Sequence, residues 1–309
     1  MSNMQMRNLT LMNNDRWYGY NGCLQPTSRN KRGVSFDAVS SYTHGEFTQN
    51  GIVPGGRYAI EGSTAGVSYN FSETESIGAY FGYTWGRIRQ TPLRTTVAYG
   101  DSYSLGARGQ GKIHKYVGVE FTENFDITGY DMQSCATVGR NVTARTHGFQ
   151  NSLRGRISGD YCHKDLKIQP FIGTNFTYFH ISSYDEEGQL LTDTYEVSRE
   201  DQALVYGEIG IMVSGNFYDE TRGTFIPFFE YEQYARIHND NHCVKATRLD
   251  GNRTLLLNIP AYKNTLSNLG GGLKWASDMG HSLFGSANII IGRGQANAYE
   301  ASLGGSISF

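Results

Sequence analysis

The chain ends in the stretch NAYEASLGGSISF, residues 297–309. In an extended strand, one side would carry Tyr299, Ala301, Leu303, Gly305, Ile307 and Phe309. The other side would carry Glu300, Ser302, Gly304, Ser306 and Ser308. Chain ends are usually frayed and polar, so a strictly alternating end that stops on phenylalanine is unusual. The alternation predicts a β-strand with one apolar face and one polar face.

The same two-residue period continues upstream through the whole chain. Runs with this period occupy 34–47, 57–71, 76–89, 94–108, 112–128, 145–161, 166–182, 203–217, 223–238, 265–276, 281–292 and 298–309, and a further short strand is possible at 16–22. Many of these runs exceed the roughly 5–6 residues that are usual for strands of globular proteins. They are long enough for the roughly 9–11 residues that a tilted strand needs to cross a bilayer. The pattern therefore predicts an all-β protein whose strands span a membrane.

The connections between these runs alternate in length. Short turns are predicted at 72–75, 109–111, 162–165, 218–222 and 277–280, and longer links at 129–144, 183–202 and 239–264. Outer-membrane barrels have tight periplasmic turns and longer surface loops, which produces this alternation. With both chain ends on the short-turn side, five short turns imply six hairpins. We therefore predict a transmembrane antiparallel up-and-down β-barrel of 12 strands.

Composition is compatible with this architecture and excludes some other classes. Hydrophobic residues make up only 39% of the chain, although aromatic residues alone make up 13%. The formal net charge of −2 gives no reason to expect a nucleic-acid partner. No run approaches the ~18 apolar residues of a membrane helix, but strands cross a membrane without one. Residues 1–15 lack the pattern of a signal peptide, so an exported protein would carry its signal on a longer parent chain, or the start of this sequence has been cut or misassigned.

Several segments together resemble one family, the autotransporter β-domain of type V secretion. These are RWYGYNG (16–22), YAIEGSTAGVSYNF (58–71), SIGAYFGYTWGRIR (76–89), YGEIGIMVSGNF (206–217), FIPFFEYEQYARI (225–237), GHSLFGSANIIIG (280–292) and the final strand. The resemblance extends from about residue 16 to residue 309. A single alternating strand has little specificity, but the order, the spacing and the final aromatic residue together have much more.

The resemblance implies an outer-membrane translocator with no enzymatic site, no cofactor and no metal. It implies a barrel at 16–309, with 1–15 as a remnant of the segment that leads through the lumen to an N-terminal passenger. The final strand would be the signal recognised by the barrel-assembly machinery, and Ser302, Gly304, Ile307 and Phe309 match that signal in place. The expected partners are outer-membrane lipid, this machinery and the chain's own passenger, and we expect a monomer.

The N-terminus and the cysteines depart from the family. No passenger is present, and residues 1–15 are short and rich in asparagine, which is a poor helix former. Some members cleave themselves between adjacent asparagines in the luminal helix, but the sequence around Asn13 and Asn14 does not match their motif. The four cysteines are Cys23, Cys135, Cys162 and Cys243. They allow three disulfide pairings, among which the sequence does not choose, and isolated thiols are the simpler interpretation.

Two other functions remain as alternatives. The first is a standalone porin-like outer-membrane channel. The second is a GDSL-type esterase, because Gly100-Asp101-Ser102 resembles the nucleophile block of such enzymes and Asp278 and His281 follow in the order that they use. A serine esterase needs a base for the serine proton and a carboxylate that orients the base. The esterase fold is α/β, however, whereas Ser102 lies within a predicted strand.

Charged residues within the predicted strands are interpreted as the wall of a hydrated lumen. They are Arg87, Arg89, Arg154, Arg156 and Glu208. In a translocator, such a lining would let an unfolded passenger pass.

Overall fold

A computed structural model of the chain describes residues 33–47, 55–72, 75–90, 96–137, 140–190, 194–219, 222–239, 242–251, 254–259, 265–277, 279–292 and 296–309. The regular structure in these segments is entirely β. Within the same segments, no helix is long and apolar enough to cross a membrane. The possible strand at 16–22 and the proposed remnant at 1–15 lie outside the described residues.

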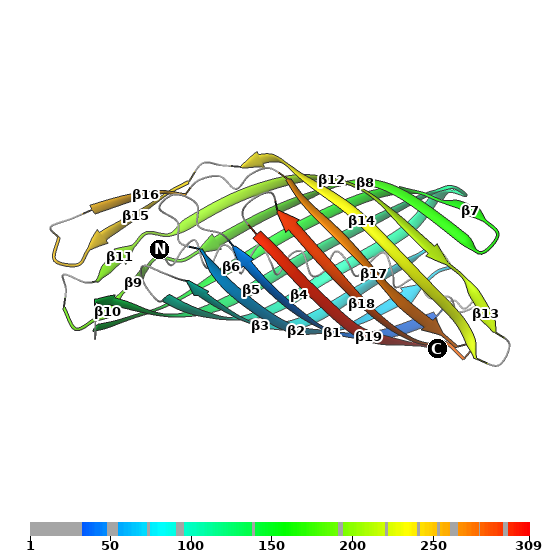
Figure 1. The fold of residues 1–309 in the computed structure, drawn as a ribbon, viewed down its shortest axis with the longest axis horizontal. Helices are drawn as coiled ribbons and strands as arrows, with labels where there is room; N and C mark the ends of the chain where they lie inside the picture. The colour runs from blue at the N-terminus through cyan, green and yellow to red at the C-terminus, as the bar shows by residue number, and fades with distance from the viewer. Residues whose placement is uncertain are drawn as a thin grey trace.

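Twelve long strands form the wall of the barrel (Figure 1). They are β1 (Gly33–Phe47), β2 (Gly56–Asn70), β3 (Ser76–Gln90), β4 (Thr96–His114), β5 (Val117–Thr137), β6 (Arg140–Gly159), β8 (Leu166–Ile181), β12 (Glu200–Gly215), β14 (Gly223–Asn239), β17 (Thr265–Ala276), β18 (His281–Gly292) and β19 (Ala296–Ser308). Each pairs antiparallel with the next, and β19 pairs antiparallel with β1. The wall is therefore closed, which satisfies the backbone hydrogen bonds that an open sheet edge would expose. The predicted antiparallel barrel of 12 strands is confirmed.

Two predicted connections were wrong, both of them around β5. The glycine-rich segment 109–111 is not a turn but part of β4, and the turn follows at 115–116. Glycine permits a turn without requiring one, and here the ladder to β3 and β5 continues through these positions. The link predicted at 129–144 is mostly strand, because β5 and β6 stay paired up to the ends of their hairpin.

The two ends of the barrel differ as the turn lengths predicted. The long links contain β9 (Tyr184–Asp185), β10 (Glu187–Gly188), β11 (Tyr195–Val197), β15 (His242–Arg248) and β16 (Thr254–Ile259). All but β10 form a small sheet in the order β16-β15-β11-β9, whereas β10 pairs with β6. At the opposite end, the described residues include the short strands β7 (Tyr161–His163) and β13 (Phe217–Asp219), which pair with β8 and β14 (Figure 1). We call these the long-loop end and the short-turn end.

The two faces of the wall have opposite polarity. Exposed hydrophobic side chains on the outer face include Phe36, Val67, Ile77, Phe81, Leu105, Ile172 and Leu303. Buried polar side chains on the luminal face include Ser68, Thr84, Ser102, Asn124, Gln150 and Asn175. On β19 the exposed Tyr299 alternates with the buried Glu300, which confirms the alternation of the final strand. An apolar exterior around a polar interior is the arrangement expected of a barrel in lipid.

Candidate functional site: the barrel lumen and the closing strand

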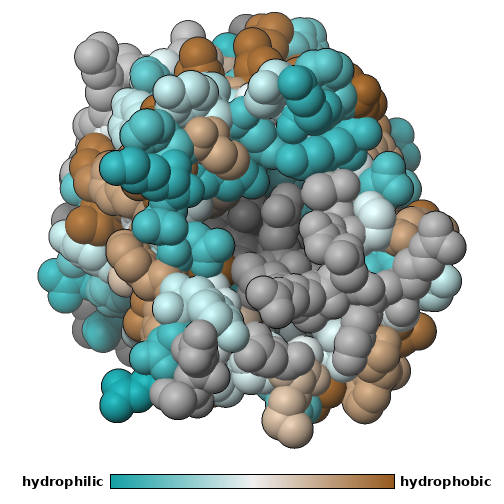
Figure 2. All heavy atoms as spheres, turned by 90° about the vertical axis from the view of Figure 1, so that its right-hand side faces the viewer, coloured by the Kyte–Doolittle hydropathy of each residue, from teal (hydrophilic) through white to brown (hydrophobic). Residues whose placement is uncertain are grey.

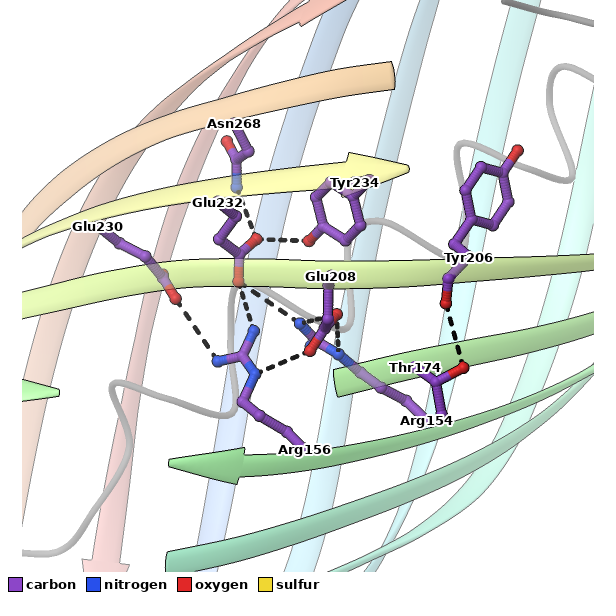
Figure 3. Close-up of polar contacts among 9 residues, drawn as sticks. All are labelled: Arg154, Arg156, Thr174, Tyr206, Glu208, Glu230, Glu232, Tyr234 and Asn268. Carbon is purple, nitrogen blue, oxygen red and sulfur yellow. Dashed lines mark hydrogen bonds and ion pairs between the residues drawn. The ribbon is translucent and has the colours of Figure 1, made fainter. Parts of the chain in front are cut away.

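Two arginines and two glutamates meet inside the barrel (Figure 3). Arg154 and Arg156 stand two residues apart on β6, so both side chains point inward. Glu208 on β12 accepts hydrogen bonds from Nε of Arg154 at 2.8 Å and from Nε of Arg156 at 3.0 Å. Glu232 on β14 lies 3.4 Å from Arg154 and also accepts a hydrogen bond from Arg156. Each arginine is thus shared between two carboxylates from different strands.

A second ring of side chains completes this luminal cluster (Figure 3). The hydroxyl of Tyr234 and the amide of Asn268 on β17 both donate to Glu232, the latter at 3.3 Å. The carboxylate of Glu230 lies 3.6 Å from the guanidinium of Arg156. We use the name luminal cluster for Arg154, Arg156, Glu208, Glu230, Glu232, Tyr234 and Asn268. It ties four strands together across the interior of the barrel.

A small residue on the intervening strand allows these contacts. Strand β8 lies between β6 and β12, and Gly173 occupies the position directly beneath the Glu208 carboxylate. A Cβ atom at Gly173 would overlap the Oε1 atom of Glu208. Nearby on β8, the ring centroid of Phe171 lies 3.8 Å from the guanidinium of Arg156, a cation–π contact. Gly173 therefore opens the path by which Glu208 reaches the arginines.

In the luminal cluster, buried positive and negative side chains neutralise one another. Side chains of the two arginines and of Glu208, Glu230 and Glu232 are at most 7% exposed. Removing such charges from water is costly, and the cost is offset only when the charges are paired and hydrogen-bonded. Three carboxylates face two guanidinium groups here, which is a structural arrangement and contains no nucleophile–base pair. In the described segments, no group of three His, Cys, Asp or Glu side chains could hold a metal ion.

Sequence reasoning found only part of this cluster. It placed Arg154, Arg156 and Glu208 on the lumen wall, and the structure confirms that placement while burying all three in ion pairs. It missed Glu230 and Glu232. The alternation in FFEYEQY (228–234) could have revealed them, because it puts both glutamates on the face opposite the exposed Phe229 and Tyr231.

The structure corrects the prediction that Arg87 and Arg89 line the lumen. Both side chains are exposed, whereas Ile88 between them is fully buried. In a strand successive side chains point to opposite faces, so Arg87 and Arg89 lie on the outer face of β3 and do not line the lumen. The prediction was wrong because it assumed that every charged side chain of a membrane-spanning strand faces the lumen.

An apolar core fills the lumen toward the long-loop end. Its barrel members include the fully buried Ile60, Ile88, Phe179 and Leu204, and the small sheet adds Tyr184, Val197 and Ala246. Burial is the main cause that raises the pKa of Tyr184 well above its usual value, and the carboxylates of Glu186 and Glu200 raise it further. The Tyr184 hydroxyl is therefore neutral within this core. The short-turn end is different, because Figure 2 shows it hollowed, with hydrophilic side chains around part of the rim.

The four residues of the predicted assembly signal lie on β19 and just beyond it, but on two different faces. Ser302 is buried on the luminal face, and its hydroxyl donates to Glu300 at 3.3 Å. Gly304, also luminal, lies beneath the ring of Phe284 from β18. Ile307 and Phe309 lie on the outer face, exposed by 43% and 72%.

Phe309 contacts the first strand of the barrel. Its backbone N–H donates to the carbonyl of Val34 at 2.9 Å, and its ring meets Phe36 edge to face at 6.2 Å between centroids. The last residue of the chain therefore lies at the seam between β1 and β19, where the barrel closes.

Replacing Gly304 by valine is expected to lower the free energy of unfolding by about 1–3 kcal/mol, because overpacking forces neighbours to move. A Cβ atom at Gly304 would lie 2.5 Å from the Phe284 ring and 2.6 Å from the Ala38 carbonyl oxygen. Denaturant unfolding of the barrel in lipid vesicles measures the effect. Gly129→Val is the matched control, because a Cβ atom there would meet nothing within 4 Å. Equal stability of both variants would show that the seam tolerates a side chain.

The proposed esterase residues are not brought together. Ser102 is buried on the luminal side of β4, where its hydroxyl accepts a hydrogen bond from Thr128 at 2.9 Å. His281 opens β18 with its side chain on the outer face, and strands β3, β2, β1 and β19 lie between β4 and β18. Asp278 lies outside the described residues, as do Cys23 and the pair Asn13-Asn14. Cys162 is a free, exposed thiol on β7.

Comparison with known proteins identifies the fold and the family. The chain is similar to the translocator domain of the autotransporter NalP from Neisseria meningitidis, with a TM-score of 0.75, 14% identity, and coverage of 100% of this chain and 96% of that one. It is also similar to the β-domain of the Bordetella autotransporter BrkA, with a TM-score of 0.63, 13% identity, and coverage of 90% and 100%. For the transport unit of AIDA-I from Escherichia coli the TM-score is 0.57, the identity 14%, and the coverage 94% of both chains.

Comparison of sequences finds a matching family model, but no matching individual protein among the curated ones. No curated protein matches the chain significantly. The model of the autotransporter beta-domain matches residues 39–288, which is most of the chain. With its closed barrel of 12 strands, this chain belongs to the autotransporter beta-domain family.

Proposed function

We propose that this chain is the outer-membrane translocator of an autotransporter, which anchors in the membrane and supports secretion of an N-terminal passenger. The observation that carries the proposal is the family match over residues 39–288 of a closed barrel. Both findings point to the Gram-negative outer membrane. The apolar outer face suits contact with lipid, and the closed ladder leaves no strand edge for a second copy to pair with, which favours a monomer.

Within this proposal the barrel domain comprises residues 16–309, and residues 1–15 are the remnant of the link to the passenger. The terminal strand serves as the signal for the barrel-assembly machinery, through Ser302, Gly304, Ile307 and Phe309. A strand whose backbone groups are unpaired before closure is a template for another strand. Support comes from the place of β19 at the seam, where it pairs with β1 and closes the barrel.

A fusion experiment tests the export function. A signal peptide and a short epitope-tagged passenger are placed before residue 1, and the epitope is detected on intact cells with antibody and by its removal with added protease. We expect surface exposure that depends on the barrel. The control is the same passenger fused to a chain truncated after Gly292, which lacks β19. An epitope that stays in the periplasm, although the barrel is folded in the membrane, would contradict the proposal.

The porin-like alternative is disfavoured by the apolar core at the long-loop end. A porin needs a continuous aqueous channel lined by exposed polar side chains, whereas Ile60, Phe179 and Leu204 in that part of the lumen are apolar and fully buried. An enzymatic role is also disfavoured, since Ser102 and His281 lie on different faces of strands that are not neighbours.

Opening this apolar core is expected to raise ion conductance. In planar bilayers we expect the unmodified chain to show little steady conductance, and Phe179→Ser to increase it several-fold, because a hydroxyl in place of the fully buried ring admits water. Leu105→Ser, on the outer face, is the matched control and should change nothing. A large steady conductance of the unmodified chain would favour the porin-like alternative.

A further inference from the structure

The outer face of β3 changes from apolar to basic near the long-loop end. Its exposed residues run from Ile77 through Phe81 to the half-buried Trp85, and then continue with Arg87 and Arg89. Ile77 and Trp85 are eight residues apart, about 26 Å along a strand. With a strand tilt of ~40° this is roughly 20 Å along the membrane normal, close to the apolar band of an outer-membrane barrel. The two arginines therefore lie just beyond the hydrocarbon, at the level of lipid headgroups.

Aromatic residues mark the same boundary. The ring centroids of Tyr83 and Tyr103 are 5.3 Å apart, and those of Trp85 and Tyr99 are 6.4 Å apart. Tyrosine and tryptophan gather at the interface between hydrocarbon and water, because their rings are apolar and their tips are polar. This belt on β3 and β4 places the arginines next to it in the headgroup region, independently of the length argument.

Three arginines are gathered here, and two of them face each other. In the register of β2 and β3, Arg57 is directly opposite Arg89, and Ala59 is opposite Arg87. Like charges directly across a sheet destabilise it unless a counter-charge is present. The carboxylate of Glu46 is such a counter-charge, 2.7 Å from Arg57, but the side chains of both residues are more than half exposed.

The other two arginines have no carboxylate of their own among the described residues. Arg87 lies over the Tyr99 ring, with its guanidinium 5.6 Å from the centroid. Acidic residues occur one row deeper, where Glu61 and Asp101 flank Trp85 in the register. Asp101 accepts a hydrogen bond from the Tyr83 hydroxyl at 2.6 Å. In the outermost described rows of β1, β2 and β3, three arginines thus face one carboxylate, that of Glu46, which leaves an excess of positive charge there.

We propose that Arg57, Arg87 and Arg89 form a binding site for a phosphate-bearing lipid headgroup in the leaflet at the long-loop end. Arginine binds phosphate oxygens in pairs through its planar donors, and basic residues at a membrane surface attract anionic lipids. The acyl chains of the lipid would lie along Phe81, Tyr103 and Leu105, which are exposed on the same face. The leaflet follows from the proposed function, since it requires the barrel to stand in the outer membrane with its long loops outward.

A binding titration with the purified, folded chain in neutral detergent micelles tests this site. Bisphosphorylated lipid A with a fluorescent acyl chain is added, and energy transfer from tryptophan is followed, because Trp85 lies beside the site. We expect saturable binding by the unmodified chain. The variant Arg57→Gln/Arg87→Gln/Arg89→Gln should bind at least about tenfold more weakly, since each arginine near the surface contributes roughly a factor of five. Arg145→Gln is the matched control, because Arg145 is also exposed on the outer face but lies near Asp131.

Equal affinity of the triple variant and the Arg145→Gln variant for lipid A would overturn the site. So would an unmodified chain that binds lipid A equally well with and without its phosphates. Complete displacement of the lipid by inorganic phosphate, at the same phosphate concentration, would also overturn it. Different migration of heated and unheated samples on a gel shows that each variant is folded. If the triple variant does not fold, the single variant Arg89→Gln takes its place in the titration, and its affinity for lipid A should fall about threefold to fivefold. The titration needs no passenger, so failed export with normal lipid binding would contradict only the proposed function.

Discussion

Replacing Glu232 by alanine is expected to lower the free energy of unfolding by about 3–5 kcal/mol, the cost of breaking a buried ion pair. Glu232 accepts hydrogen bonds from Arg156, Tyr234 and Asn268 and lies 3.4 Å from Arg154. Its side chain is fully buried. Without it, the two buried guanidinium groups would lose one of the carboxylates that they share. Four hydrogen bonds are lost at this one position, two of them within the ion pairs with Arg154 and Arg156, so we expect this to be the largest stability effect of a single substitution.

Guanidinium-induced unfolding in lipid vesicles, followed by tryptophan fluorescence, measures this change. Asp131→Ala is the matched control, because it removes an ion pair with Arg145 whose side chains are 44% and 86% exposed. Exposed pairs contribute only about 0–1 kcal/mol, so the control should remain close to the unmodified chain. A Glu232→Ala variant as stable as this control would mean that water or rearranged neighbours replace the lost carboxylate.

Replacing Phe309 by aspartate is expected to reduce the amount of barrel in the outer membrane several-fold while synthesis continues. Phe309 lies at the short-turn end, on the outer face of the seam. A charged residue near the membrane interface costs only about 0–1 kcal/mol, and aspartate less than the basic residues. Stability alone therefore predicts a small effect, and a large one would come from failed recognition during assembly.

Two measurements separate these causes. Immunoblots of membrane fractions report assembly in cells, and refolding of the purified variant into lipid vesicles reports intrinsic stability. We expect the first to fall and the second to remain nearly unchanged. Phe217→Asp is the matched control, because Phe217 is an exposed aromatic residue of β13 at the same end of the barrel, and β14, β17 and β18 separate β13 from β19. Normal membrane levels of the Phe309 variant would contradict the role of the final strand as an assembly signal.

The sequence by itself determined the strands and their number. The alternation of side chains and the lengths of the turns are local properties, set by the two-residue period of an extended chain. They were enough to predict 12 strands, the polarity of β19 and the difference between the two ends. They failed at 109–111, where three residues with two glycines lie within a strand, and at 129–144, where pairing between β5 and β6 extends both strands.

Only the tertiary structure decided which charges meet. The arginines of β6 reach Glu232 of β14 across β8 and β12, so this contact exists only because the closed wall curves around the lumen. The structure also showed which face of β3 is the outer one, and therefore that Arg87 and Arg89 point outward beside Arg57. Local patterns build the wall of this barrel, whereas its luminal cluster depends on closure, because closure brings distant strands together.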